Sequence, residues 1–418
     1  MKKIFFQDFF IYSSVFVYMT WLVLSGFFLH FDNATRLASV AIFTSFFICC
    51  YCYKSSLSKV SAPLTVWMLW GIYQAANLVA RGGDYVHAYK TIPFFIFIFC
   101  GKLAFFAVVA TMLLRNSSKT VVAVSAALSC NCLLFLIFGE ITTYTGNVER
   151  LLSNVINANE IAFSAVTLVV LCCYMLLKSP KTFLFSWLGI LLAVVVITYA
   201  ASRTAFACLV PIAIWGGWNI LRSKFKLITS IIIAAIIAVT ILLPVWNYIE
   251  NRTAVGYRFQ YREQEMERLQ LRSGIISRVL GERSIYVYDG VDLWLRNPIF
   301  GVGYLNYINY SRYGTVCHIE YMAQLAEGGA VGFLIYGVFL SMLIYPLLKK
   351  KALALPEKTL AWSALFVLAM VQLGSFVSMK NDFYVLCACI LVGPMIKTGT
   401  ASSCIGPLSK SELAKDRR

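Results

Sequence analysis

Charged residues are scarce in this sequence: Asp, Glu, Lys and Arg make up 13% of 418 residues, whereas 60% are hydrophobic. Apolar runs of about 18–22 residues recur, and ~20 residues suffice for an α-helix to cross the ~30 Å hydrocarbon core of a membrane. Because a backbone in lipid must satisfy its own hydrogen bonds, these runs should be helices. The composition therefore predicts an all-α fold, a polytopic transmembrane helical bundle.

Other scarcities exclude other classes of protein. The chain has only three histidines, widely separated, and its 13 cysteines lack the spacing of metal ligands or of a disulfide framework. We therefore predict no metal and no cofactor. The net charge of +17 comes largely from residues between the apolar runs, and no nucleic-acid-binding motif accompanies it. We predict no nucleic-acid partner.

Twelve spans are predicted. They cover residues 9–30, 37–53, 60–79, 92–114, 120–138, 160–177, 182–200, 204–221, 227–248, 319–348, 359–377 and 383–396. The first has no A-x-A-like end and is read as an anchor rather than a cleaved signal. The chain thus divides into spans 1–9 (residues 1–248), a large loop (249–318), spans 10–12 (319–396) and a polar tail (397–418).

Basic residues predict the orientation, since cytoplasmic loops are rich in Lys and Arg. With the N-terminus inside, twenty basic residues fall on the cytoplasmic side and six in the short opposite loops, namely Arg36, Arg81, Lys90, Arg150, Arg203 and Lys380. Both termini are therefore expected in the cytoplasm, and residues 249–318 on the other side.

Residues 182–221 are predicted to form a hairpin. One helix of that length would be about 60 Å long, twice the core thickness. Basic clusters flank both ends, which places both on one side of the membrane. The tip is then Ser202-Arg203-Thr204, so Arg203 is expected at the outer surface near the large loop.

The large loop carries nine arginines and no lysine. Its residues 257–280, with charges of both signs, predict a solvated helix. Residues 285–295 mix apolar and aromatic side chains and predict an interfacial helix, which Asn297-Pro298 would stop. Gly301-Val302-Gly303 predicts a flexible turn, and His318 begins the next apolar helix.

Three of these pieces together resemble the O-antigen polymerase and O-antigen ligase family of bacterial envelope glycan assembly. They are 201–205 (ASRTA) at the hairpin tip, 280–283 (LGER) leading to 301–303 (GVG), and His318 through 327–329 (EGG). Residues 157–162 (NANEIA) are similar to a further family signature, Asn-Pro-Asn-x-x-Ala, with Ala158 in place of proline. The resemblance covers residues 140–345, and Ile319 departs from it because many relatives have a polar residue there.

The resemblance implies a glycosyltransferase in the bacterial inner membrane, with a periplasmic active site and no metal or nucleotide sugar. Its substrate would be an oligosaccharide on undecaprenyl diphosphate, and membrane lipid and a chain-length regulator protein would be partners. Arg203 and Arg283 are the candidates for binding the diphosphate, because arginine binds phosphate oxygens bidentately and stays charged. His318 is the candidate for positioning the acceptor hydroxyl or removing its proton.

Further candidates are weaker. Arg150, Asn159, Arg296 and Tyr321 are candidate glycan-binding residues. An arginine at a span end is also typical of an interfacial anchor, and most charges in such a loop are solvated.

Three more residues have competing interpretations. Lys102 lies inside a predicted span, which marks it as a functional candidate without an evident partner. Cys317 beside His318 suggests a thiol nucleophile, but no third residue to orient it is evident. Glu327, nine residues beyond His318, is assigned a structural role.

Several functions remain open. Residues 301–303 and 318–327 resemble polymerases of repeat units slightly more than ligases. Polymerisation is therefore slightly favoured over transfer to lipid A-core. A flippase for lipid-linked oligosaccharides is a rival, although no internal repeat typical of transporters is evident. A glycosyltransferase of another membrane family and a structural scaffold are the remaining alternatives.

Overall fold

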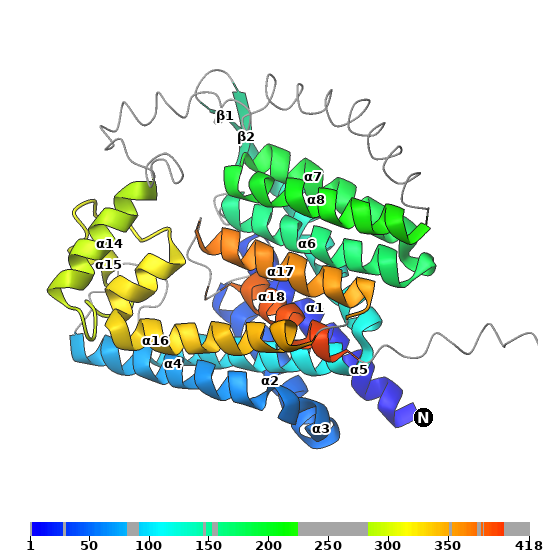
Figure 1. Ribbon diagram of the computed structural model, residues 1–418, viewed down its shortest axis with the longest axis horizontal. Coiled ribbons are helices and arrows are strands. Elements are labelled where there is room, and N and C mark those ends of the chain that lie inside the picture. The colour runs from blue at the N-terminus through cyan, green and yellow to red at the C-terminus, as the bar shows by residue number, and fades with distance from the viewer. Residues whose placement is uncertain are drawn as a thin grey trace, which may run out of the picture.

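The computed structural model is a bundle of long helices capped at one end by a small group of short ones (Figure 1). It describes residues 2–27, 31–81, 92–144, 148–152, 158–224, 283–350, 353–373, 378 and 380–396. The α-helices are α1 (Lys2–Phe27), α2 (Phe31–Cys52), α3 (Lys54–Leu57), α4 (Ser61–Arg81), α5 (Ile92–Phe138), α6 (Ala158–Lys178), α7 (Phe183–Ala200), α8 (Arg203–Lys224), α14 (Ser284–Arg296), α15 (Tyr307–Tyr310), α16 (Glu320–Lys349), α17 (Leu355–Gln372) and α18 (Asn381–Val392). Short 3-10 helices cover Ser58–Val60, Pro180–Thr182 and Gly393–Met395.

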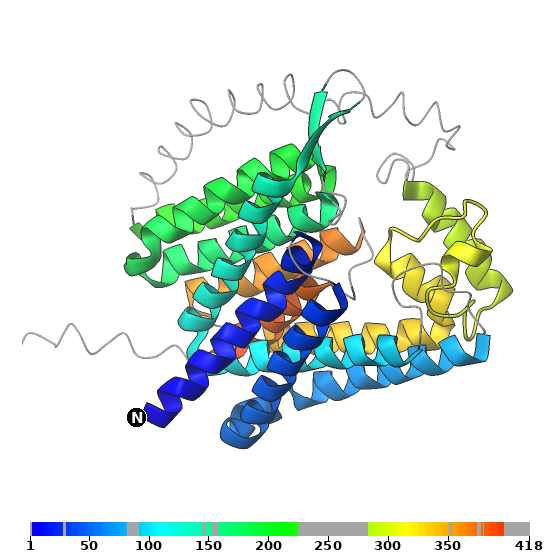
Figure 2. The ribbon, with the colours of Figure 1, turned by 180° about the vertical axis from the view of Figure 1, so that it is seen from behind.

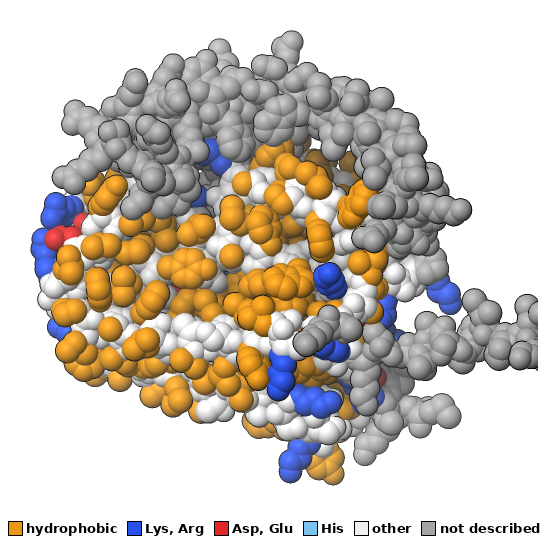
Figure 3. Space-filling view, in the orientation of Figure 1, with side chains coloured by type: hydrophobic (Ala, Val, Ile, Leu, Met, Phe, Trp, Pro, Cys, Tyr) orange, Lys and Arg blue, Asp and Glu red, His pale blue; other side chains and the backbone are white. Residues whose placement is uncertain are grey.

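The helices form a membrane-embedded bundle. Within the described ranges, five helices are long and apolar enough to cross a membrane, or six if one bent pair is taken as a single span. Apolar side chains cover the middle of the visible face, and blue Lys and Arg side chains gather towards its two ends (Figure 3). The helices α6 and α18 are buried along nearly their whole length and form the centre of the core.

Helices occupy the predicted spans wherever the structure describes them. The predicted span 227–248, the solvated helix 257–280 and the tail 397–418 lie outside the described residues. The spans at 92–114 and 120–138 appear as one element, α5, which is broken at Asn116 (φ −150°, ψ 83°). Figure 2 shows the chain turning back at this break. Without the break, 47 residues would extend for about 70 Å, more than twice the hydrocarbon thickness.

The second and third predicted spans are joined by a sharp bend between two helices. The helical segments Leu37–Cys52 and Lys54–Arg81 meet at a bend of 100°. At the bend, Tyr53 donates a hydrogen bond of 2.6 Å to Asp8 Oδ1, and the Arg115 guanidinium lies 3.9 Å from the Tyr53 ring centroid. Helices α1, α2 and α5 are thereby held together at the end that carries the N-terminus.

The all-α fold is confirmed, and the connector between α5 and α6, for which no element was predicted, contains a short β-hairpin. Strands β1 (Glu140–Tyr144) and β2 (Val148–Leu152) pair antiparallel there, with Ile141 opposite Leu151 and Thr143 opposite Glu149. Thr and Tyr in β1 and Val and Leu in β2 are residue types that suit strands. The connector is short enough for this propensity to be overlooked beside the long apolar runs.

The predicted hairpin over 182–221 is confirmed. Helix α7 ends at Ala200, Ala201 takes the left-handed conformation (φ 53°), and α8 begins at Arg203. A single left-handed residue that closes a helix is a common C-terminal device. The hairpin tip therefore lies at Ser202, as predicted.

A helix over the predicted stretch 285–295 is also confirmed. It is α14, and its C-terminal cap is Asn297, directly before Pro298. Together with α15 it lies at the end of the bundle opposite the N-terminus (Figure 1). This end holds the residues considered next.

Candidate functional site

Arg283, one of the nine arginines of the predicted loop 249–318, is bonded to the hairpin tip. It is the N-cap residue of α14, and its Nη1 donates a hydrogen bond of 2.7 Å to Thr204 Oγ1 in the first turn of α8. Thr204 directly follows Arg203, and both arginine side chains are half-buried. The structure thus brings the two predicted diphosphate-binding residues to one place, where α14 meets the tip.

His318 lies against the same helix. Its ring packs edge-on against Tyr286, with the ring centroids 5.3 Å apart and the planes at 82°. Residues three apart on an α-helix share a face, so Arg283 and Tyr286 project from one side of α14. That side of α14 therefore contacts both the hairpin tip and the predicted acceptor-activating histidine, which is half-buried.

Helix α14 is anchored on α16 by a small apolar cluster. Its Gly290 lies so close to Met322 that an added Cβ would be 3.1 Å from Met322 Cε. The buried members of the cluster are Leu293, Val302, Tyr307, Cys317, Ile319, Ala323 and Ala326. Burial of these side chains fixes the positions of both Tyr286 and His318, which flank the cluster.

Residues 301–303 do not form the flexible turn that was predicted. They lie across a break in α16 at Gly329 (φ 61°, ψ −165°), where Val302 N–H bonds Ala326 O at 2.9 Å. Ala330 N–H in turn bonds Pro298 O at 2.8 Å. The backbones approach so closely that a Cβ on Gly329 would lie 2.4 Å from Ile299 O. The loop instead supplies the hydrogen-bond partners that the broken helix needs.

Helix α4 secures the same junction from the other side. Asn77 Nδ2 donates to Phe300 O at 2.8 Å and to Glu327 O at 3.1 Å, and Tyr73 donates to Gly328 O at 2.6 Å. The buried Glu327 carboxylate accepts a 3.2 Å bond from Tyr307 N–H. These contacts agree with the structural role assigned to Glu327.

The Cys317 thiol is unsuited to nucleophilic attack. It is buried and donates a hydrogen bond of 3.3 Å to Ile319 O. Burial raises the pKa of the Cys317 thiol well above its usual range. Because the thiolate is the nucleophilic form, this position carries little nucleophile at neutral pH.

The four candidate glycan-binding residues are scattered. Tyr321 is the second residue of α16 and is half-buried, and the half-buried Asn159 lies in the first turn of α6. Arg150 is in β2, where it pairs with Thr142. Arg296 ends α14, about 20 Å from Arg283 by helical rise. Its side chain is 61% exposed and paired with Asp292 at 2.6 Å, so it does not join the arginines at the tip.

Lys102 has the partner that the sequence did not reveal. The buried ammonium donates to Asn381 Oδ1 at the start of α18 and lies 5.3 Å from the Tyr18 ring centroid. Asn381 Nδ2 in turn donates to Tyr18 O at 2.9 Å. An amide oxygen and an aromatic face thus partly compensate the desolvation of this charge.

Sequence reasoning missed Thr204 and Tyr286, which hold the predicted arginine and histidine. Thr204 was adjacent to a predicted residue, and the three-residue spacing of Arg283 and Tyr286 on a predicted helix was the available signal. Glu320 was missed as well. Its buried carboxylate accepts bonds from Gln324 Nε2 at 2.7 Å and from Ser378 N–H at 3.2 Å, a contact that no local pattern predicts.

Residues 188–337 match a family model described as O-antigen ligase. Comparison with the curated proteins gives no match. The matched range runs from α7 through the hairpin tip, α14 and His318 into α16, so it contains every contact described above between the tip and α14. The predicted resemblance is confirmed for this part of the chain.

Proposed function

We propose that this membrane protein, whose residues 188–337 carry an O-antigen ligase-type domain, polymerises oligosaccharide repeat units carried on undecaprenyl diphosphate. The product would be O-antigen or a related surface polysaccharide. The observation that supports the proposal is the hydrogen bond of 2.7 Å between Arg283 and Thr204, which brings the Arg283 guanidinium to the residue next to Arg203 at the hairpin tip.

The donor supplies the leaving group. When the bond between the anomeric carbon and the phosphate oxygen breaks, negative charge grows on the departing lipid diphosphate. Arg203 and Arg283 bind those oxygens, and charge-assisted bonds strengthen as the charge develops. Such stabilisation is available from side chains alone, so no metal is required in this scheme.

The acceptor supplies the nucleophile. A sugar hydroxyl of the second lipid-linked glycan attacks the anomeric carbon as the diphosphate leaves, which inverts the configuration there. His318 accepts the hydroxyl proton, a contribution typically worth ~10²–10⁴-fold in rate. The edge-on contact with Tyr286 orients the imidazole ring for this transfer.

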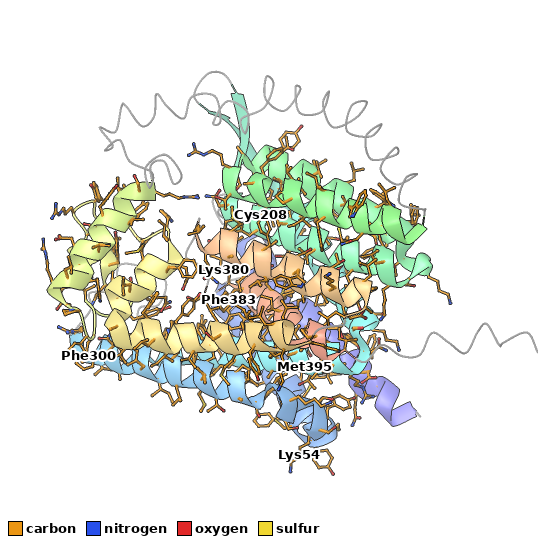
Figure 4. All side chains as sticks on the ribbon, in the orientation of Figure 1. Lys54, Cys208, Phe300, Lys380, Phe383 and Met395 are labelled. Carbon is orange, nitrogen blue, oxygen red and sulfur yellow. The ribbon has the colours of Figure 1, made fainter. Side chains whose placement is uncertain are left out.

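The proposed orientation follows the positive-inside rule. The N- and C-termini would be cytoplasmic and α14 periplasmic, in the inner membrane of a bacterium. Two features support this: α14 lies at the end opposite the N-terminus, and Lys54 lies at the N-terminal end (Figure 4). A chain-length regulator protein is proposed as a partner.

Ligation is the second candidate. The description of the matching family model, O-antigen ligase, favours it directly. A ligase would use the same donor, diphosphate site and base, and would transfer the finished glycan to lipid A-core. The two candidates differ only in the acceptor.

Deletion of the gene distinguishes them. Loss of a polymerase leaves core carrying single repeat units, whereas loss of a ligase leaves bare core and lipid-linked polymer. Complementation with Arg203→Ala, Arg283→Ala or His318→Ala should fail, while Arg312→Ala, an exposed residue paired with Asp292 at 2.8 Å, should restore the wild-type pattern. Full complementation by all three site variants would point to a scaffold. Accumulation of unflipped single units on the cytoplasmic face would point to a flippase.

A further inference from the structure

The first residues of α18 are held by buried contacts with three other helices. Asn381 bonds Lys102 of α5 and the carbonyl oxygen of Tyr18 in α1. Its neighbour Asp382 accepts a hydrogen bond of 2.6 Å from Ser164 Oγ in α6. Because Asn381, Lys102 and Ser164 are buried, these bonds define the local backbone strongly. The position of residue 380, directly before them, is therefore set without any help from its own side chain.

The segment before α18 is also tied to the start of α16. Ser378 N–H bonds the buried carboxylate of Glu320 at 3.2 Å. Glu320 follows His318 by two residues, and Ser378 precedes Lys380 by two. The backbone two residues before Lys380 is thus bonded to the first residue of α16, which itself follows the candidate base by two residues.

Lys380 itself reaches the start of α6. Its Nζ forms an ion pair with Glu160 Oε1, and the two side chains are 23% and 41% exposed. Figure 4 shows Lys380 at the end of α18 that faces α14 and α15, with Met395 at the other end. A partly exposed ion pair contributes only modestly to stability, and the buried contacts already hold this backbone. The pair is therefore partly accessible to a ligand, and its loss should lower the melting temperature only slightly.

We propose that Lys380 is a further substrate-binding residue, which binds an anionic group of the lipid-linked glycan and exchanges Glu160 for that group. The inference rests on the proposed function. An ammonium has three donors and binds carboxylate and phosphate oxygens alike, so the exchange replaces one charge-assisted bond with another. The ligand chemistry is an anion, either a phosphate of the lipid carrier or a carboxylate of an acidic sugar.

Two measurements on purified full-length protein in nanodiscs test the proposal. The first is the Kd for undecaprenyl diphosphate, and the second is the KM for the lipid-linked glycan. Lys380→Met should raise the Kd, the KM or both about tenfold or more, as expected for loss of a bond to a charged group. Glu160→Gln should lower the same constant, because it removes the carboxylate that competes with the ligand for Lys380. A raised Kd identifies the carrier phosphate as the anion, whereas a raised KM with an unchanged Kd identifies an acidic sugar.

The charge-swapped double variant Lys380→Glu with Glu160→Lys separates binding from structure. The swap re-forms the ion pair, so it should restore the melting temperature but leave binding weak. The matched control is Lys178→Met, which removes the ion pair of 2.5 Å with Glu357 at the opposite end of α6 and should leave both constants unchanged. Restoration of binding by the swap, or a Lys380→Met variant with wild-type constants, would overturn the inference. Failure of the wild type to extend glycan would instead overturn the proposed function, and the Kd measurement would still decide the role of Lys380.

Discussion

The Nη1 atom of Arg283 lies 2.7 Å from Thr204 Oγ1, so the N-cap residue of α14 is bonded to the first turn of α8. The two residues are 79 positions apart in the chain. This contact orients the Arg283 guanidinium towards the hairpin tip. It is the link between the Arg-rich segment and the hairpin tip on which the proposed diphosphate site depends.

Thr204→Val removes this hydrogen bond at nearly constant volume. We expect chain extension to fall about tenfold to a hundredfold, because a hydrogen bond to a charged group is worth ~1.5–3 kcal/mol. The matched control is Thr65→Val, which removes only an exposed bond of 3.0 Å within α4. Initial rates of extension measure the effect, and equal rates for the two variants would show that Arg283 needs no orientation by Thr204.

The contact with Tyr286 should hold the His318 ring in its orientation. An edge-to-face ring pair contributes ~0.5–1.5 kcal/mol, so Tyr286→Leu should lower kcat roughly 2- to 12-fold, while Tyr286→Phe, which keeps the ring, should stay near wild type. Tyr288→Leu provides the control, since Tyr288 is an exposed tyrosine on the same helix. A kcat for Tyr286→Phe as low as that for Tyr286→Leu would assign the effect to the hydroxyl group instead.

The break in α16 should tolerate only glycine. Gly329→Ala places a methyl group 2.4 Å from Ile299 O, at a backbone conformation that L-residues rarely adopt. The variant should be destabilised by several kcal/mol, seen as a lower melting temperature or as failure to purify as a monodisperse protein. Gly337→Ala, in the same helix with open space around its Cβ, should be neutral or slightly stabilising. Equal melting temperatures for both variants would contradict the tight junction with residues 299–301.

Lys102 and Asn381 should behave as a pair. Asn381→Leu leaves the buried ammonium without its amide oxygen and should cost roughly 3 kcal/mol, the scale for removing one partner of a buried ionic contact. Adding Lys102→Met removes the charge and should recover part of the lost stability. Thermal unfolding of the single and double variants gives the coupling energy, and strictly additive effects would show that the two side chains act independently.

Features set by local pattern could be predicted from the sequence. The hairpin at α7 and α8 followed from an apolar stretch too long for one crossing between basic ends, and α14 followed from an aromatic-rich stretch that ends at Asn297-Pro298. The roles of Arg203, Arg283 and His318 remain predictions, although the structure gathers the hairpin tip and His318 around one face of α14.

Long-range contacts could not be predicted. Asn381, the partner of Lys102, is 279 residues away in the chain, and nothing in its neighbourhood marks it as buried. Gly301 suggested a flexible turn because glycine permits one. In the structure its backbone instead packs closely against the backbone of α16 near the break at Gly329. The strands β1 and β2 were overlooked because five-residue strands carry little signal beside 20-residue apolar runs.

Chain extension in a defined system tests the central claim most directly. Purified protein in liposomes would receive a synthetic undecaprenyl-diphosphate-linked repeat unit in the presence of a metal chelator, and the glycan products would be separated by size. The account predicts a ladder of lengthened lipid-linked glycans with release of undecaprenyl diphosphate, abolished by Arg203→Ala, Arg283→Ala and His318→Ala and retained by Arg312→Ala. A ladder of wild-type intensity from the three site variants would contradict the assignment of this site.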